Sequence, residues 1–176
     1  MTLPTALLLA MGLLGAADIW FFHTRAHALR ARAESRAELV THALRGPTYA
    51  ALFALVPNFE LAGTWLGALF ALLAIDLAIS AVDFWLEPAS RAGLGGLPRG
   101  EYLLHVALAV LFGALVTSVL YEASDRIGSA SAVRWLGFSE GPPLPLRIAV
   151  TSMAPAVLWT GTLDLAAALR LGTARV

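Results

Sequence analysis

The sequence contains no cysteine and no lysine among its 176 residues. Without cysteine it can form neither a disulfide nor a thiolate metal site, and it has no cysteine nucleophile. Without lysine it cannot form the Schiff base that holds retinal or pyridoxal phosphate, because that linkage requires an amine side chain. All twelve basic residues are therefore arginines, and they balance twelve acidic residues to a net charge of zero. This balance gives no indication of nucleic-acid binding.

Charge is scarce in the chain, whereas apolar residues dominate it. Charged side chains make up 14% of the sequence and hydrophobic ones 59%, and the mean hydropathy is +0.75. A composition this apolar is typical of proteins that cross a membrane several times. We therefore expect an all-α fold, in which residues 1–176 form a single helical bundle embedded in the lipid bilayer.

Five apolar stretches are candidates for transmembrane helices, which need about 20 residues each. The first lacks the positively charged start of a secretory signal, so we interpret it as a retained helix. Residues 23–38 contain neither glycine nor proline, and we expect them to continue the first helix as a helical cytoplasmic extension. The third stretch is expected to end before Pro88. The five stretches are 3–22, 39–56, 61–86, 101–120 and 146–169.

The arginines indicate an orientation for this bundle. With five spans, nine arginines lie at one end, and only Arg126, Arg134 and Arg147 lie at the other. Positively charged loops remain preferentially in the cytoplasm, so the end with nine arginines is expected to face it. The N-terminus is then outside, and the C-terminus inside, a bacterial-type inner (plasma) membrane.

Every histidine stands four residues from another potential metal ligand, and one pair of acids repeats this spacing. On a helix, residues i and i+4 lie one turn apart on the same face, so each pair can offer two ligands to one ion. Such groups are costly inside a membrane and indicate a function. The predicted topology brings all four pairs to the cytoplasmic face. They are His23 and His27, Glu38 and His42, Asp83 and Glu87, and Glu101 and His105.

Helices that supply histidine and carboxylate pairs to one centre follow the plan of dimetal proteins built in bundles. Nitrogen and oxygen ligands without sulfur suit iron, and also zinc or manganese. The sequence therefore predicts two transition-metal ions, with iron first, in a metal-dependent oxidoreductase. Its substrate would be lipid-like or quinone-like and would react at the cytoplasmic membrane face. The resemblance to integral-membrane di-iron enzymes is one of concept, because the histidine boxes of desaturases and the ExxH motifs of ferritin-like proteins are absent.

Other functions fit the same residues. One zinc ion held by His23, His27 and His105 could activate water in a membrane hydrolase. Two histidines could instead be axial ligands of a b-type haem, although haem needs no carboxylates at this spacing. The chain could also be a non-catalytic subunit that acts with partner membrane proteins, or a small transporter whose interior acids carry protons or cations.

Several further polar residues stand near the predicted centre. Asp18, Asp76 and Asp164 are isolated in apolar stretches and could accept hydrogen bonds around a metal or form a proton path. Tyr49 and Tyr102 could serve in redox or acid–base steps, although tyrosines near a membrane face are usually interfacial anchors. Glu101 could simply cap its helix, because the N-terminal end of a helix favours an acid.

Overall fold

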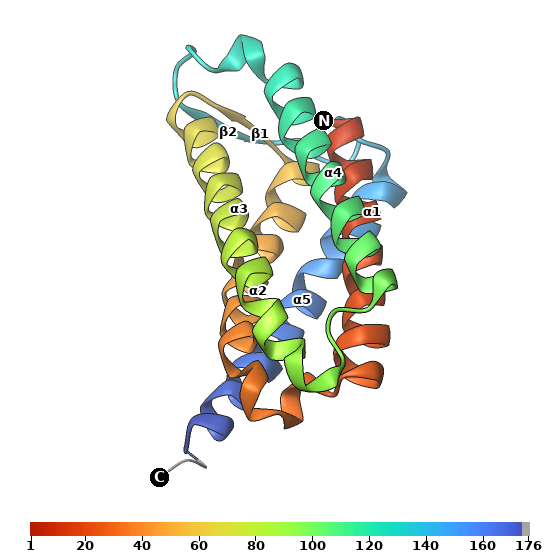
Figure 1. Ribbon diagram of the computed structural model, residues 1–176. Coiled ribbons are helices and arrows are strands. Elements are labelled where there is room, and N and C mark those ends of the chain that lie inside the picture. Colours follow the sequence, from red (N-terminus) through yellow and green to blue (C-terminus); the bar gives the residue numbers. More distant parts are fainter. Residues whose placement is uncertain (174–176) are drawn as a thin grey trace.

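The computed structural model describes residues 1–173 and consists of five long helices and one small sheet (Figure 1). Successive helices run in opposite directions, so the N-terminus lies at the end that carries the sheet and α5 finishes at the other end. The all-α prediction is confirmed in the described residues apart from this sheet. The helices are α1 (Thr2–Asp18), α2 (Arg36–Asn58), α3 (Thr64–Arg91), α4 (Arg99–Glu122) and α5 (Leu144–Thr173), and the strands are β1 (Phe59–Ala62) and β2 (Ala132–Trp135).

Four of the five helical segments are long and apolar enough to cross a membrane, which indicates a multi-pass membrane protein. The expected fifth span, α2, is long enough at 23 residues but not apolar enough, because charged and imidazole side chains interrupt its first half. It nevertheless runs alongside α1, α3 and α5 through the bundle (Figure 1). The four qualifying segments are Thr2–Ala26, Thr64–Leu94, Arg99–Glu122 and Leu144–Thr173.

The most extensive contact between helices joins α2 and α5. The two backbones meet at Gly46 and Gly161, where a Cβ added to Gly161 would lie 3.3 Å from Cα of Gly46. Small residues at a crossing allow helices to approach closely, and close packing replaces the hydrophobic effect as the attraction between helices in lipid. This crossing therefore fixes α2 against α5 at mid-length.

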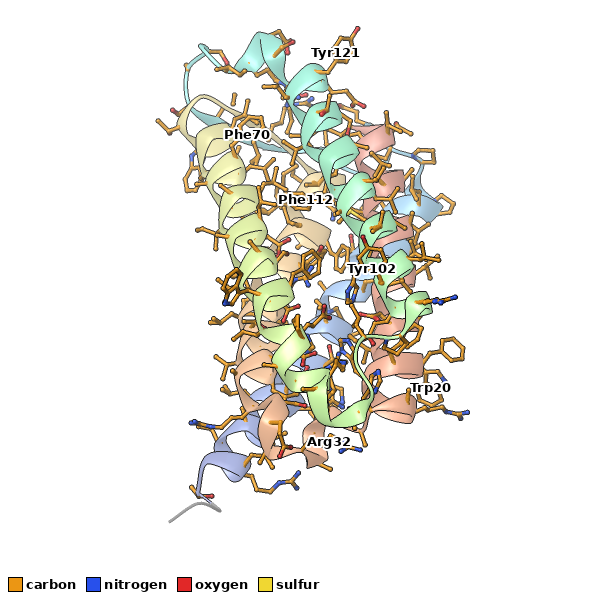
Figure 2. All side chains as sticks on the ribbon, viewed as in Figure 1. Trp20, Arg32, Phe70, Tyr102, Phe112 and Tyr121 are labelled. Carbon is orange, nitrogen blue, oxygen red and sulfur yellow. The ribbon has the colours of Figure 1, made fainter. Side chains whose placement is uncertain are left out.

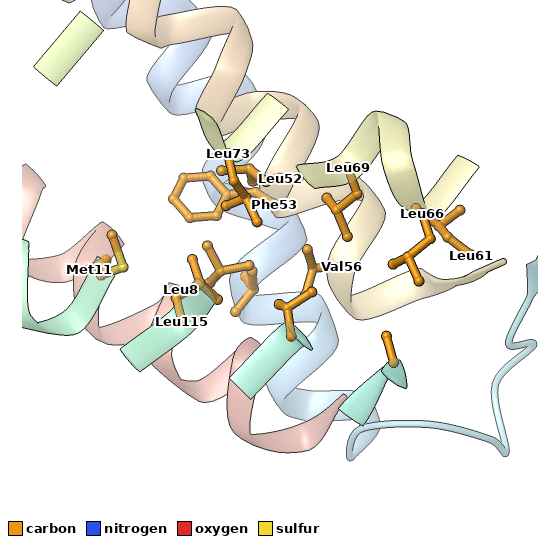
Figure 3. Close-up of a cluster of buried hydrophobic side chains, with 13 residues drawn as sticks. Leu8, Met11, Leu52, Phe53, Val56, Leu61, Leu66, Leu69, Leu73 and Leu115 are labelled. Atoms are coloured by element: carbon orange, nitrogen blue, oxygen red, sulfur yellow. The ribbon is translucent and has the colours of Figure 1, made fainter. Parts of the chain in front are cut away.

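An apolar core fills the half of the bundle nearer to the sheet (Figure 3). Each of the five helices contributes a side chain that is at most 1% exposed, and these are Leu8, Leu52, Leu66, Leu115 and Val150. Large apolar side chains such as Trp85, Val110 and Trp159 cover the outer surface, as is normal for helices that face lipid. The other half of the interior is polar.

The predicted helical extension over 23–38 is wrong beyond Ala26. The first helix continues as a π-helical segment, Ile19–Ala26, and ends at His27. Ala28 then has a left-handed φ of 50°, and short 3₁₀ turns return the chain directly to α2. Leu29, which is 1% exposed, packs in a cluster with Leu39 and Ala168. Burial of this side chain favours the turn over an exposed helix.

The third helix also ends later than predicted. Pro88 lies within α3, which continues to Arg91. A proline lacks only one hydrogen bond to the preceding turn and is tolerated near a helix end, especially in a membrane bundle. The extra turn carries Arg91 on the same face as Glu87, and both side chains are buried.

The two-stranded sheet was not predicted. β1 and β2 pair antiparallel, with Phe59 opposite Trp135 and Ala62 opposite Ala132. Arg134 on β2 donates hydrogen bonds to Glu60 and Glu140 on the exposed surface. These hydrogen bonds from Arg134 hold the pKa of Glu60 below its usual value.

Candidate metal centre

The eight predicted ligands come together in the polar half of the bundle, opposite the sheet. Figure 2 shows nitrogen and oxygen atoms gathered between the helices below the level of Phe112. The side chains of His23 and His42 are 10% and 12% exposed. The other six residues are buried, and they are His27, Glu38, Asp83, Glu87, Glu101 and His105. Residues from four helical segments therefore meet in one buried cluster.

A first group of four residues can hold a metal ion: Asp18, His23, Glu101 and His105. One potential ligand atom from each lies within 4.8 Å of the others. Asp18 Oδ2 is 3.2 Å from Nε2 of His23 and 3.3 Å from Nε2 of His105. Glu101 Oε1 is 3.6 Å from the same nitrogen of His23. Two imidazoles and two carboxylates form a ligand set that suits iron, zinc or manganese.

Two atoms of this group are buried without a hydrogen-bond partner, Nε2 of His23 and Oδ1 of Asp18. The nitrogen is within ion-pair distance of Asp18 Oδ2, but the two groups are not aligned for a hydrogen bond. Buried polar atoms are rarely left unsatisfied in native proteins, and an absent ion is one recognised explanation. A cation between these residues would satisfy Nε2 of His23.

A second group shares His23 and adds Glu38 and His42. The rings of His23 and His42 stack in parallel, with centroids 4.7 Å apart and 2° between their planes. Nε2 of His42 is 3.8 Å from Glu38 Oε1 and 3.4 Å from Asp83 Oδ1. The Glu38/His42 spacing thus places both side chains in one group, as the helix periodicity requires.

The remaining predicted ligands contact members of these groups. His27 Nε2 lies 3.0 Å from Glu101 Oε2, and Glu87 Oε2 lies 3.3 Å from Nδ1 of His105. Asp83 instead faces Nε2 of His42, the nitrogen that also faces Glu38. A carboxylate at the second nitrogen of an imidazole orients the ring for a metal. Direct metal ligation by His27, Asp83 and Glu87 stays a prediction.

Arg91 occupies the middle of the cluster, and its guanidinium is 0% exposed. It donates hydrogen bonds of 2.7 and 2.8 Å to both oxygens of Glu38 and one of 2.7 Å to Glu101. The helix spacing indicated only its proximity to Glu87, which is 4.0 Å away. Arg91 therefore ties α3 to α2 and α4, and each carboxylate oxygen keeps a second lone pair for another partner.

The described part of the chain holds more buried negative than positive charge around the centre. Arg30 pairs with Asp164, Arg45 stands beside Asp76 and Asp83, and Arg91 pairs with two glutamates. Three guanidinium groups thus face seven carboxylates, which leaves four negative charges when the histidines are neutral. Uncompensated buried charge is strongly destabilising, so the cluster requires cations or protons. The seven acids are Asp18, Glu38, Asp76, Asp83, Glu87, Glu101 and Asp164.

A cavity of about 450 Å³ adjoins the cluster. Its volume lies within the range of roughly 300–1,000 Å³ that is usual for small-molecule sites. All five helices line it. The polar part of its wall includes Asp18, His23, His42, Asp83 and His105, and the apolar part includes Met11, Phe53, Leu77, Phe84, Phe112 and Met153.

Comparison with known proteins finds no relative. No protein-family model, no curated protein and no solved structure matches the chain. Its activity is therefore inferred from the chemistry of the buried cluster and of the cavity beside it.

Proposed function

We propose that the protein is an integral-membrane oxidoreductase with two transition-metal ions, of which iron is the expected one, and with a hydrophobic substrate. The observation that carries this proposal is the pair of histidine–carboxylate groups that share His23 inside a bundle of membrane-length helices. Two divalent ions would balance the four excess negative charges. Zinc and manganese fit the same atoms, but zinc has no redox chemistry, so iron or manganese is required for an oxidoreductase and iron is the one that we expect.

In this proposal the two groups hold one ion each. Asp18, Glu101 and His105 bind the first ion, Glu38 and His42 bind the second, and His23 lies between them. His27 and Glu87 orient the ligands that they contact, and Asp83, which faces the same nitrogen of His42 as Glu38, is a further ligand of the second ion. Arg91 holds two of the ligating carboxylates in place through its hydrogen bonds.

The position of the centre supports a reaction inside the membrane near its cytoplasmic face. The cavity beside it is mostly apolar, which favours a lipid-like or quinone-like substrate. The arginines of the described chain lie mainly at the same end of the bundle as the centre, whereas Arg126, Arg134 and Arg147 lie at the sheet end. By the preference of arginine for the cytoplasmic side, the N-terminus is outside.

A second candidate function is proton or cation transport, alone or as a subunit of a larger complex. The same excess of four negative charges can be balanced by protonation of the four histidines instead of by metal. Rows of buried ionisable side chains such as these carry protons in pumps and transporters. The two candidates differ in whether the purified protein contains a transition metal.

Elemental analysis after purification in detergent without chelators tests the proposal. We expect about two transition-metal ions per chain, mainly iron, and an optical or paramagnetic signal that changes on reduction. His23→Ala should lose more than half of the metal, because this residue belongs to both groups. Glu140→Ala should retain it, since this exposed acid lies beyond the opposite end of the bundle. A metal-free parent protein would refute the oxidoreductase and favour transport, and zinc alone would favour a hydrolase.

A further inference from the structure

We infer that the cavity binds a neutral, ring-bearing amphiphile of the quinone class, with an oxygen of its ring at Arg45 and Tyr49. This inference rests on the proposed function, because it names the substrate class of the same centre. Both residues line the cavity from α2, one helical turn apart.

The polar wall of the cavity offers hydrogen-bond donors for a carbonyl oxygen. Arg45 Nη2 donates to the hydroxyl oxygen of Tyr49 at 3.3 Å. That oxygen accepts, so the hydroxyl group of Tyr49 keeps its own proton to donate, and the ring oxygen would share this proton with the neighbouring carboxylate of Asp76. Nε of Arg45 is buried without a partner, as is Oδ2 of the neighbouring Asp76. The site therefore has one unused donor, Nε of Arg45, for a quinone and one unused acceptor, Oδ2 of Asp76, for the hydroxyl of a quinol.

The charge around Arg45 disfavours an anionic ligand. Its guanidinium stands 3.7 Å from Asp76 and 3.6 Å from Asp83, so two acids already match its single positive charge. Asp18 and Asp164 also line the cavity. A carboxylate or phosphate head group would lose its hydration and face like charges, which is costly in a low dielectric. A neutral carbonyl or hydroxyl meets neither penalty.

Aromatic side chains form much of the apolar wall and suit a flat ring. Phe53 packs beside Tyr49 with ring centroids 5.7 Å apart, and Phe84 and Phe112 line the cavity from α3 and α4. Offset or edge contacts between such rings add to the gain from burial. Met11 and Met153 supply flexible thioethers that adapt to substituents on the ring.

The cavity opens sideways toward the lipid between α3 and α4. Leu77 and Phe84 line it and are 57% and 39% exposed, and Ala109 on the facing helix is also both lining and exposed. An apolar tail can therefore remain in the bilayer while the ring enters. Inside, Arg45 lies 3.6 Å from Asp83, which lies 3.4 Å from His42. The side chains of Arg45 and Asp83 then connect the ring oxygen to His42 of the second ion group.

Binding of a defined probe to the detergent-solubilised protein tests this inference. The probe is 2,3-dimethoxy-5-methyl-6-decyl-1,4-benzoquinone, measured by equilibrium dialysis, and the anionic comparison is decanoate at pH 8. We expect saturable quinone binding that is at least tenfold tighter than decanoate binding. Tyr49→Phe should weaken quinone binding about fivefold, the value of one neutral hydrogen bond. Tyr121→Phe, at an exposed position beyond the cavity, should leave it unchanged.

A pair of glycine substitutions tests the location. An added Cβ meets no atom within 4 Å at Gly15 or at Gly113, so both positions accept a side chain at its point of attachment. Only Gly15 lines the cavity. Gly15→Leu should weaken quinone binding at least tenfold by filling that space, whereas Gly113→Leu should bind like the parent. Equal binding by these two variants, or a preference for decanoate, would overturn the inference.

Metal analysis of the same samples separates this inference from the proposed function. A parent protein that contains its metal but binds no quinone refutes the substrate class and leaves the metal centre intact. A parent protein that binds quinone without metal refutes the proposed centre and supports the cavity assignment. If Tyr49→Phe loses metal or fails to fold, the Gly15→Leu and Gly113→Leu pair still decides the question.

Discussion

Arg91 offers a sharp test of the electrostatics of the centre, because the chain contains a matched arginine on its surface. Arg91 and Arg134 each donate hydrogen bonds to two glutamates. Arg91 is fully buried, whereas the side chain of Arg134 is 49% exposed. We predict that Arg91→Gln is strongly destabilising and that Arg134→Gln changes stability little.

The expected magnitude follows from the charge that remains after the substitution. Removing one partner of a buried ion pair costs about 3–5 kcal/mol, because the other charge is left in a low dielectric without compensation. For a chain of this length, that loss corresponds to a fall in Tm of about 6–20 °C. Arg91→Gln leaves both Glu38 and Glu101 without their arginine, so the metal-free protein should show a shift in this range.

Thermal unfolding in one detergent, followed by circular dichroism, measures the difference between the variants. A double variant, Arg91→Gln with Glu38→Gln, removes one of the uncompensated buried negative charges together with the arginine, and it should recover part of the lost stability. Equal shifts for Arg91→Gln and Arg134→Gln would refute the reasoning, since burial would then make no difference. A double variant less stable than Arg91→Gln would refute it as well.

The remaining predictions concern topology and the sheet. Because the chain has no cysteine, Ala92→Cys and Ser129→Cys each introduce a single thiol that a membrane-impermeant maleimide can label on intact bacterial cells. We expect Ser129→Cys to react on intact cells and Ala92→Cys to react only after lysis. Labelling of both variants from outside would contradict the topology. The pKa of Glu60 is lower in the folded protein than its usual value. The ion pair of Glu60 therefore stabilises the sheet fully at pH values above the pKa of Glu60 in the unfolded chain, and this stabilisation is lost as the pH falls through the pKa of Glu60 in the folded protein. Hydrogen exchange at β1 and β2, corrected for the intrinsic rate, should therefore show acid-induced opening in the parent and not in Glu60→Gln.

The convergence of the ligand pairs was predictable from the sequence because it depends on helix periodicity and on alternating direction. Residues four apart share a face, and antiparallel spans bring the end of one helix to the start of the next. Glu38 with His42 and Glu101 with His105 therefore lie where the sequence places them. The isolated Asp18 was expected near the centre, and the structure brings it between His23 and His105.

Arg91 and the sheet were missed because each depends on contacts between distant segments. Arg91 follows Pro88 in a region rich in glycine and proline, which is typical of a loop, yet two glutamates from other helices hold it inside the bundle. β1 and β2 are four residues each and pair across the whole of α3 and α4. Strands this short carry little periodic signal.

The turn after Ala26 was missed for a related reason. Residues 23–38 have the propensity for a helix and no residue that breaks one, so local rules favour its continuation. The competing term is burial of Leu29 in the cluster that contains Ala168 of α5, a residue near the far end of the chain. The sequence around Leu29 does not indicate its contact with Ala168, and tertiary packing overrides the helix propensity of this segment.

The polar character of α2 has a consequence for biogenesis. A single arginine near the middle of a helix costs about 2.5–3.5 kcal/mol on insertion scales, and α2 carries Arg45 in addition to Glu38 and His42. Groups that compensate these residues come later in the chain, from α3 and α5. The backbone of α2 makes its close contact with α5, the last of the five helices to be synthesised. We therefore expect α2 to remain at the membrane interface during translation while its neighbours insert, and to enter the bilayer together with α5. A nascent chain released before Leu144 presents α2 without its α5 neighbour, the kind of exposed polar helix that membrane quality-control proteases remove.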